Sequence, residues 1–286
     1  MAETWFAVTV DVPQGHSEAV ANFLVEHGSP GLQLDERNGV VSLTAYFATD
    51  PPVEPLRRFC ADISCNSPGS DGVTVRVRTT PDEDWAANWK KHFPPQIIGK
   101  KLYVCPPWAP AAPSGRVTVV IDPGMAFGTG QHATTRGCLY LLEDTVREGA
   151  VTRALDVGTG SGVLAIALAK LGVAEVWGVD NDPSICRIAV ANACHNGVSG
   201  CTHFASSLAD APGMFDLITA NLFADVLQEL AGQLVHALRP TGTLICSGLL
   251  GTDAPGISTA YGALGFRVEQ RYEERPWVTV ALRRSD

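Results

Sequence analysis

The sequence carries little positive charge for its size. Its 286 residues include 21 Lys and Arg against 30 Asp and Glu, which gives a formal net charge of −9 at pH 7. Proteins that bind naked DNA or RNA gather Lys and Arg against the phosphates. The charge therefore disfavours direct contact with nucleic acid, and it is compatible with a basic protein partner or with none.

Long apolar runs and paired cysteines are also missing. No segment reaches the length of a membrane span, and the first residues, MAETWFAVTVDVPQ, do not place a long apolar run after a basic region. The eight cysteines form no CxxC pair, and scattered cysteines in a chain of this length are typical of reduced thiols in the cytosol. We expect a cytoplasmic protein that does not associate with membranes.

One group of potential metal ligands lies near residue 200. It consists of Cys194, His195, Cys201 and His203. The spacing matches no zinc pattern, and the residues fall where a helix is expected to end and a strand to begin. Because cysteine is commonly buried without any ligand, we expect no metal site here.

The composition that remains is ordinary for a globular protein, with 45% hydrophobic and 18% charged residues. The first 80 residues alternate in type. Strands are expected at 5–12, 31–36, 40–47 and 73–80, and helices at 17–28 and 53–63, with a tight hairpin turn at Asn38-Gly39. The order β-α-β-β-α-β is that of a ferredoxin-like domain. Residues 1–80 hold 10 acidic and 5 basic side chains, so this domain has a charge of −5.

Residues 81–121 predict a connector followed by a short β segment. The stretch PDEDWAANWKKHF places Trp85 and Trp89 on one face of a helix. We expect these tryptophans to pack between domains rather than to form a ligand cage, because aromatic side chains dominate buried contacts. The segments KLYVCPPW and RVTVVID predict extended structure on either side of a loop at 109–115.

From residue 131 onward helices and strands alternate. A helix is expected at about 131–147, and a long amphipathic helix at 224–238. Alternation of this kind predicts a doubly wound, Rossmann-like parallel sheet. Two consecutive strands close the chain, GFRVEQRYE and PWVTVALR, which indicates an antiparallel hairpin on one edge of that sheet.

A glycine-rich turn within LDVGTGSGVLAIALAK (155–170) predicts a cofactor site. Glycines 158, 160 and 162 follow Asp156 in the spacing DxGxGxG, whereas the dinucleotide pattern GxGxxG would need a third glycine at Val163. Glycines let a backbone approach a ligand closely, and a helix begins at the turn. Asp180 ends the next strand, where a carboxylate can accept hydrogen bonds from both ribose hydroxyls. The motif is similar to the first motif of S-adenosylmethionine-dependent methyltransferases.

A second glycine-rich stretch, DPGMAFGTGQHATTR (122–136), precedes that loop, and ANLFADVL (220–227) follows it. Together with the connector and the closing PWVTV, these segments resemble the PrmA family, the methyltransferases of large-subunit ribosomal protein L11, over essentially the whole chain. A simpler interpretation of 122–136 is a turn before a helix, capped by Thr134 or Thr135. That interpretation does not explain Phe127 or the resemblance.

The resemblance implies S-adenosyl-L-methionine as the cofactor and a division into a substrate-recognition domain (1–80), a linker (81–121) and a methyltransferase domain (122–286). It implies a cofactor site and a catalytic pair, Asn221 and Leu222, beside the target amine. The residues implied for the cofactor are Phe127, Gly128, Thr135, Gly158, Gly160, Asp180 and Asn221. Phe223 is bulkier than the residue usual in the family, which bears on the shape of the target pocket.

The implied reaction is methyl transfer to lysine side-chain amines or the N-terminal amine of ribosomal protein L11. The oxygen of Asn221 and the carbonyl of Leu222 would accept hydrogen bonds from the amine. His132 is a candidate base, and a contact with its own helix is an equal alternative for it. Methylation of lysines in another protein, of RNA or of a small molecule, and a non-catalytic cofactor-binding scaffold are the other functions considered. We expect a monomer.

Overall fold

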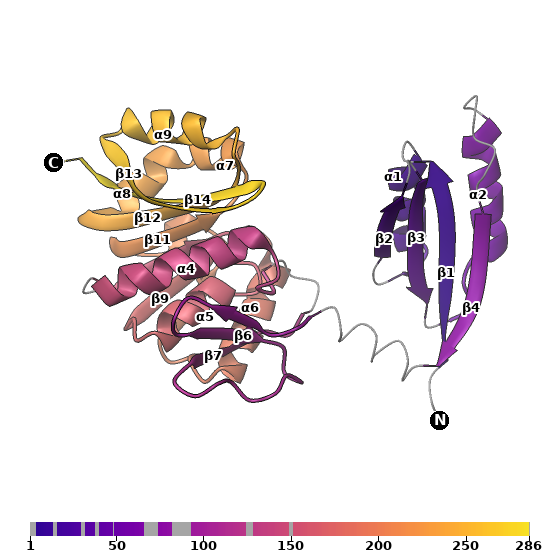
Figure 1. The fold of residues 1–286 in the computed structure, drawn as a ribbon, viewed down its shortest axis with the longest axis horizontal. Helices are drawn as coiled ribbons and strands as arrows, with labels where there is room; N and C mark the ends of the chain where they lie inside the picture. Colours follow the sequence, from indigo (N-terminus) through magenta and orange to yellow (C-terminus); the bar gives the residue numbers. More distant parts are fainter. Residues whose placement is uncertain are drawn as a thin grey trace. The chain divides into compact units, whose positions relative to one another are not determined.

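The computed structural model describes residues 4–13, 16–29, 32–37, 40–47, 49–65, 74–81, 93–123, 128–148 and 151–285. The chain divides into two compact units, Met1–His92 and Phe93–Asp286. Figure 1 shows the elements of each unit with their labels. None of the helices in the described ranges is both long enough and apolar enough to cross a membrane.

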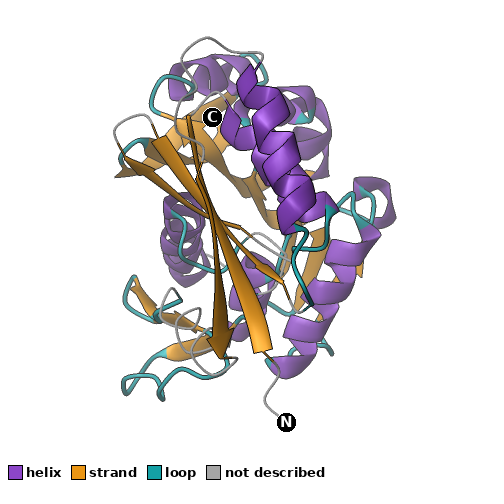
Figure 2. Ribbon diagram, turned by 90° about the vertical axis from the view of Figure 1, so that its right-hand side faces the viewer, coloured by secondary structure: helices purple, strands orange, loops and turns teal. Residues whose placement is uncertain are grey.

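The first unit has the predicted order of elements, which is β1 (Thr4–Pro13), α1 (Ser17–Glu26), β2 (Leu32–Arg37), β3 (Val40–Phe47), α2 (Val53–Cys65) and β4 (Thr74–Pro81). Its antiparallel sheet has the order β2-β3-β1-β4. Both helices lie on one side of this sheet (Figure 2), because alternate residues such as Val10 and Leu43 turn toward Leu24 and Leu56 to form one core. The predicted turn at Asn38-Gly39 and the tryptophans of the connector lie outside the described residues.

The second unit begins with a small sheet of order β5-β6-β7, formed by Gln96–Ile98, Leu102–Cys105 and Val117–Val120. Its first helix, α4 (Ala133–Glu148), holds this sheet through Glu143. The buried carboxylate of Glu143 accepts hydrogen bonds from the backbone N–H groups of Lys100 (2.8 Å) and Lys101 (3.0 Å). The small sheet is thereby fixed to α4.

The main sheet confirms the predicted doubly wound architecture with an antiparallel hairpin at one edge. Its order is β10-β9-β8-β11-β12-β14-β13. The strands are β8 (Arg153–Val157), β9 (Glu175–Val179), β10 (Thr202–Ala205), β11 (Phe215–Asn221), β12 (Leu238–Leu250), β13 (Phe266–Glu274) and β14 (Trp277–Arg284). The first five in sheet order pair in parallel, and β14 pairs antiparallel with both β12 and β13.

Helices cover both faces of this sheet (Figure 1). Helices α4, α5 (Val163–Lys170) and α6 (Pro183–His195) contribute to one core, and α7 (Ala224–Glu229), α8 (Ala231–Ala237) and α9 (Ala254–Gly262) to the other. Successive residues of a strand serve opposite cores, as Ala154 and Leu155 of β8 do. A short 3-10 helix, η2 (Leu208–Asp210), lies between β10 and β11.

Three details differ from the sequence-based expectations. The prediction of a single helix at 224–238 is wrong, because the helix is interrupted at Leu230 and divided into α7 and α8. Gly232 lies two residues further on, and glycine weakens helices. The sequence predicts a strand only at GTLICSG (242–248), whereas β12 starts at Leu238, because Pro240 and Gly242 resemble a turn in the sequence. Helix α9 was not expected, because it contains a proline and two glycines.

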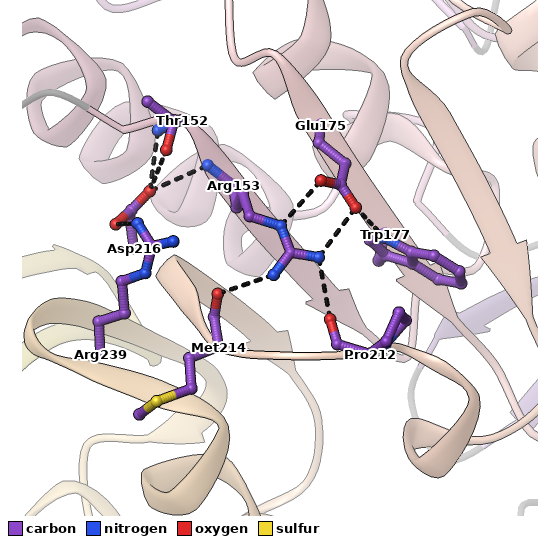
Figure 3. Close-up of polar contacts among 8 residues, drawn as sticks. All are labelled: Thr152, Arg153, Glu175, Trp177, Pro212, Met214, Asp216 and Arg239. Atoms are coloured by element: carbon purple, nitrogen blue, oxygen red, sulfur yellow. Dashed lines mark hydrogen bonds and ion pairs between the residues drawn. The ribbon is translucent and has the colours of Figure 1, made fainter.

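The amino ends of the parallel strands are joined by an ion-pair network (Figure 3). Arg153 of β8 pairs with Glu175 of β9 (2.8 Å) and also donates to the backbone oxygens of Pro212 and Met214. Asp216 of β11 pairs with Arg239 of β12 (2.6 Å). These charged side chains lie at the end of the sheet opposite to the carboxyl ends of the parallel strands, and they form ion pairs with one another.

Candidate active site at the carboxyl ends of the parallel strands

The cofactor loop predicted at 158–162 connects β8 to the amino end of α5. The backbone N–H groups of Gly158 and Thr159 both donate to the carbonyl of Val179, at 2.8 and 2.9 Å, which ties the loop to the end of β9. Glycines 158, 160 and 162 all have positive φ angles, of 71°, 54° and 83°. Side chains other than glycine rarely adopt this backbone conformation, so the glycine spacing is required by the turn itself.

Asp180 lies directly after β9 and beside this loop. One carboxylate oxygen accepts a hydrogen bond from the backbone N–H of Gly160 (3.0 Å), and the other accepts one from the N–H of Asp182 (3.2 Å). The residue is partly exposed. Since each carboxylate oxygen can accept more than one hydrogen bond, Asp180 retains acceptor capacity for a ligand.

Asp156 supports the loop from below, a role that its place in the motif did not reveal. It is fully buried and accepts hydrogen bonds from the hydroxyls of Thr159 (2.8 Å) and Thr219 (2.7 Å). Burial raises the pKa of Asp156 to about 6, although both hydroxyls favour its charged form. The glycine turn is thus supported by a buried carboxyl that joins β8 to β11.

The earlier glycine-rich stretch contacts the cofactor loop directly. The hydroxyl of Ser161 donates to the backbone oxygen of Gly128 at 2.7 Å. A Cβ atom on Gly128, whose φ is 100°, would stand 2.9 Å from that hydroxyl oxygen. Residues 124–127, and with them the predicted cofactor residue Phe127, lie outside the described part of the chain. The contact nevertheless brings the two glycine-rich segments together at one place.

A second link between the two segments comes from α6. The side chain of Asn192 donates to the backbone oxygen of Ser161 (2.9 Å) and accepts from the N–H of Asp122 (3.4 Å). One turn later, Asn196 accepts from the N–H of Val120 (2.8 Å) and donates to its oxygen (2.6 Å). Neither residue was predicted from the sequence, although two asparagines four apart at the end of an alanine-rich helix are a sign of buried polar contacts.

Thr135, in the first turn of α4, has a buried hydroxyl without a partner. Its exposed fraction is 1%, and its Oγ1 makes no hydrogen bond to any residue that the structure describes. The neighbouring Thr134 is equally buried, but its hydroxyl lies 2.7 Å from Nδ1 of His132. Buried hydroxyls are usually paired, so an unpaired one within the earlier glycine-rich stretch fits the binding of a polar ligand.

His132 lies at the amino end of α4 and contacts its own helix. Besides Thr134, its ring meets the ring of Trp277 edge-on, with 4.9 Å between the centroids. Burial lowers the pKa of His132, and Arg136 lowers it further while Glu274 opposes them. The imidazole is therefore held mainly neutral at pH 7, and its Nδ1 is engaged with the helix.

The predicted catalytic pair follows β11. Asn221 is the last residue of that strand, is partly buried, and takes part in no side-chain hydrogen bond within the described ranges. The N–H of Leu222 donates to the oxygen of Ser247 on β12 (3.1 Å). The Leu222 side chain lies against Gly158, because a Cβ atom there would be 2.5 Å from Leu222 Cδ2. Phe223 points into solvent, with 74% of its surface exposed.

No group of three or more His, Cys, Asp or Glu side chains in the described ranges is arranged to hold a metal ion. Of the four residues considered in the sequence, Cys194 is exposed and His203 stacks on Trp177, with 4.9 Å between the ring centroids. The thiol of Cys201 donates to the oxygen of Val198 at 3.3 Å. His203 and Cys201 therefore each have a partner within the fold.

Comparison with known proteins identifies the family of this chain. The family model described as "Ribosomal protein L11 methyltransferase (PrmA)" matches residues 4–285. Proteins named ribosomal protein L11 methyltransferase are 36% identical in Geobacter metallireducens, with 97% of both chains covered, and 37% identical in Pelotomaculum thermopropionicum, with 98% of both covered.

A solved structure, the ribosomal protein L11 methylase of Lactobacillus delbrueckii subsp. bulgaricus, is 30% identical and superimposes with a TM-score of 0.61. That superposition covers 68% of this chain and 99% of the other. Because the family model and the relatives span nearly all of the sequence, the chain belongs to the PrmA family of ribosomal protein L11 methyltransferases.

Proposed function

We propose that this protein transfers methyl groups from S-adenosyl-L-methionine to lysine side-chain and N-terminal amines of ribosomal protein L11. The observation that carries the proposal is the contact between Leu222 and Gly158. This contact supports the proposal because the strand end that would receive the amine lies against the loop that would hold the cofactor. Donor and acceptor sites on adjacent strands are the arrangement that a transfer reaction needs.

The residues present fit S-adenosylmethionine. Gly158 and Gly160 would allow close approach of its amino-acid part, and the Asp180 carboxylate would accept hydrogen bonds from the ribose hydroxyls. The unpaired hydroxyl of Thr135 would gain a partner. The proposal also includes Phe127 and Gly128 of the earlier stretch as residues beside the cofactor. When bound, the cofactor supplies an activated methyl group on a positively charged sulfur.

The work of this chain is to orient the amine. A lysine amine has a pKa near 10.4 in water, so most of it is protonated at neutral pH and must lose a proton before it can react. Removal from water and a nearby positive charge both lower that pKa. The side-chain oxygen of Asn221 and the carbonyl of Leu222 would then accept hydrogen bonds from the two remaining N–H groups. Their positions would direct the lone pair of the nitrogen toward the methyl group.

The first unit would recognise the protein substrate. Its acidic balance, 10 acidic against 5 basic side chains in residues 1–80, suits a basic ribosomal protein. The same negative charge speaks against a direct contact with nucleic acid. We further propose that the protein acts in the cytoplasm and as a monomer.

The substitution Asn221→Ala tests the assignment of the catalytic pair. Turnover with ribosomal protein L11 should fall by about 100-fold or more, because the amine loses one of its two acceptors. Affinity for S-adenosylhomocysteine, measured by calorimetry, should stay within a few fold of the unmodified protein because the glycine loop is intact. Full turnover in the variant would refute the role of Asn221. Tight cofactor binding without turnover in the unmodified protein would favour a scaffold.

A further inference from the structure

Leu222 lies between two glycines that belong to the strands on either side of β11. In the sheet, β11 is flanked by β8 and β12. Gly158 follows the end of β8, and Gly248 lies near the end of β12. Both have positive φ angles, 71° and 82°. The two glycines thus approach the same residue from opposite sides.

The contacts at the two glycines differ in kind. A Cβ atom on Gly158 would meet the end of the Leu222 side chain, which can rotate away. A Cβ atom on Gly248 would stand 2.8 Å from the carbonyl carbon of Leu222 and closer still to its oxygen. Real Cβ atoms do not approach backbone atoms so closely, so any side chain at 248 requires the Leu222 peptide to shift. That shift is on the order of 1 Å, judged from normal packing distances.

The backbone of Leu222, which carries this carbonyl, is held in place by its neighbours. Its N–H donates to the oxygen of Ser247, the residue before Gly248, at 3.1 Å. Ser247 is fully buried and its hydroxyl donates to the backbone oxygen of Thr134 at 3.1 Å. The strand end that holds the Leu222 amide is therefore anchored to the first turn of α4, beside Thr135.

The local backbone geometry of β12 explains only part of why a glycine stands at position 248. The pairing of β12 with β14 is irregular between Cys246 and Leu249, and a glycine with positive φ suits such a bulge. The bulge explains the φ angle of Gly248. It does not require that the space over Gly248 be filled by the carbonyl of Leu222.

We propose that Gly248 is a positioning residue for methyl transfer, which fixes the Leu222 carbonyl where the target amine donates its hydrogen bond. The inference rests on the proposed function, because it assumes that this carbonyl receives the amine. Gly248 does not touch the amine itself. Its lack of a side chain determines the place of the acceptor, and a displacement of about 1 Å in a reacting geometry can cost on the order of 100-fold in rate.

The test compares Gly248→Ala with Gly265→Ala. Gly265 has the same φ of 82°, and a Cβ atom there meets nothing within 4 Å, so this control carries the backbone strain without the contact. We expect Gly248→Ala to lower kcat on ribosomal protein L11 by about 100-fold, with affinity for S-adenosylhomocysteine within about twofold of the control. Gly265→Ala should keep the kcat of the unmodified protein.

A kcat within about threefold of the control would overturn the inference, and so would a loss of cofactor affinity that matches the loss of activity. If Gly248→Ala does not fold, Gly248→Asn and Gly265→Asn replace the pair, because asparagine adopts positive φ more readily than alanine and still carries a Cβ atom. The same expectations and refutations apply to that pair. Inactivity of the unmodified protein on ribosomal protein L11 would instead contradict the proposed function.

Discussion

The unpaired hydroxyl of Thr135 allows a prediction with two opposite parts. The substitution Thr135→Val keeps the shape of the side chain and removes the hydroxyl. Without a ligand this hydroxyl is buried and unpaired among the described residues, a state that costs about 1–3 kcal/mol. The variant should therefore be more stable than the unmodified protein when no ligand is bound. With roughly 2–4 °C per kcal/mol for a unit of this size, the melting temperature should rise by several degrees.

Cofactor binding should change in the opposite direction. If the hydroxyl bonds to the cofactor, its loss removes a hydrogen bond worth about 0.5–1.5 kcal/mol, and the affinity for S-adenosylhomocysteine should fall roughly 2- to 12-fold. Differential scanning calorimetry of the free protein and titration calorimetry with the ligand measure the two parts separately.

Thr134→Val is the matched control. The Thr134 hydroxyl already has a partner in His132, so its removal should lower the stability of the free protein by about 1 kcal/mol and leave ligand affinity unchanged. The reasoning is refuted if Thr135→Val destabilises the free protein as Thr134→Val does, or if it binds the ligand as well as the unmodified protein does.

Three further predictions concern the loop, its support and the exposed aromatic residue. Ser161→Ala removes the hydrogen bond to Gly128 and should weaken S-adenosylhomocysteine binding several-fold in calorimetry, and unchanged affinity would contradict the link between the two glycine-rich segments. The pKa of Asp156, about 6, lies above its unfolded value of 3.8, so folding favours the protonated form, and stability is lost as pH rises from about 4 through about 6. Asp156→Asn should lack this loss, which amounts to about 3 kcal/mol. Urea unfolding at several pH values measures the free energy of unfolding of both proteins. The reasoning is wrong if that free energy changes with pH in the same way in the variant and in the unmodified protein. Phe223→Ala should leave melting temperature and cofactor affinity unchanged and raise KM for the protein substrate, because the side chain is 74% exposed beside the proposed catalytic pair. An unchanged KM would exclude a substrate contact.

Much of the fold follows from patterns that are local in the sequence. Alternation of apolar residues predicts the strands of the first unit, and glycine spacing with Asp156 and Asp180 predicts the loop at the end of β8. These features are readable because the turn imposes its own φ angles, whatever lies around it. The order of strands and helices then fixes the doubly wound sheet with few alternatives.

Contacts between distant residues are less accessible to such reasoning. Ser161, Asn192 and Gly248 were not predicted from the sequence, because each makes its contact with a residue far away in the chain. The interruption of the helix at Leu230 was not predicted, because the helical spacing of apolar residues continues across Leu230 although the helix itself is divided there into α7 and α8. Spacing predicts the positions of candidate functional residues, and only the assembled sheet shows which residues they contact.

The central claim is that this chain methylates ribosomal protein L11 with S-adenosylmethionine. Its most direct test is intact-protein mass spectrometry of purified, unmethylated ribosomal protein L11 after incubation with this protein and the cofactor. The account predicts mass increments of whole methyl additions, and their loss with Asp180→Ala, whose carboxylate lies against Gly160 of the cofactor loop. No increment from protein that binds the cofactor in calorimetry would contradict the claim.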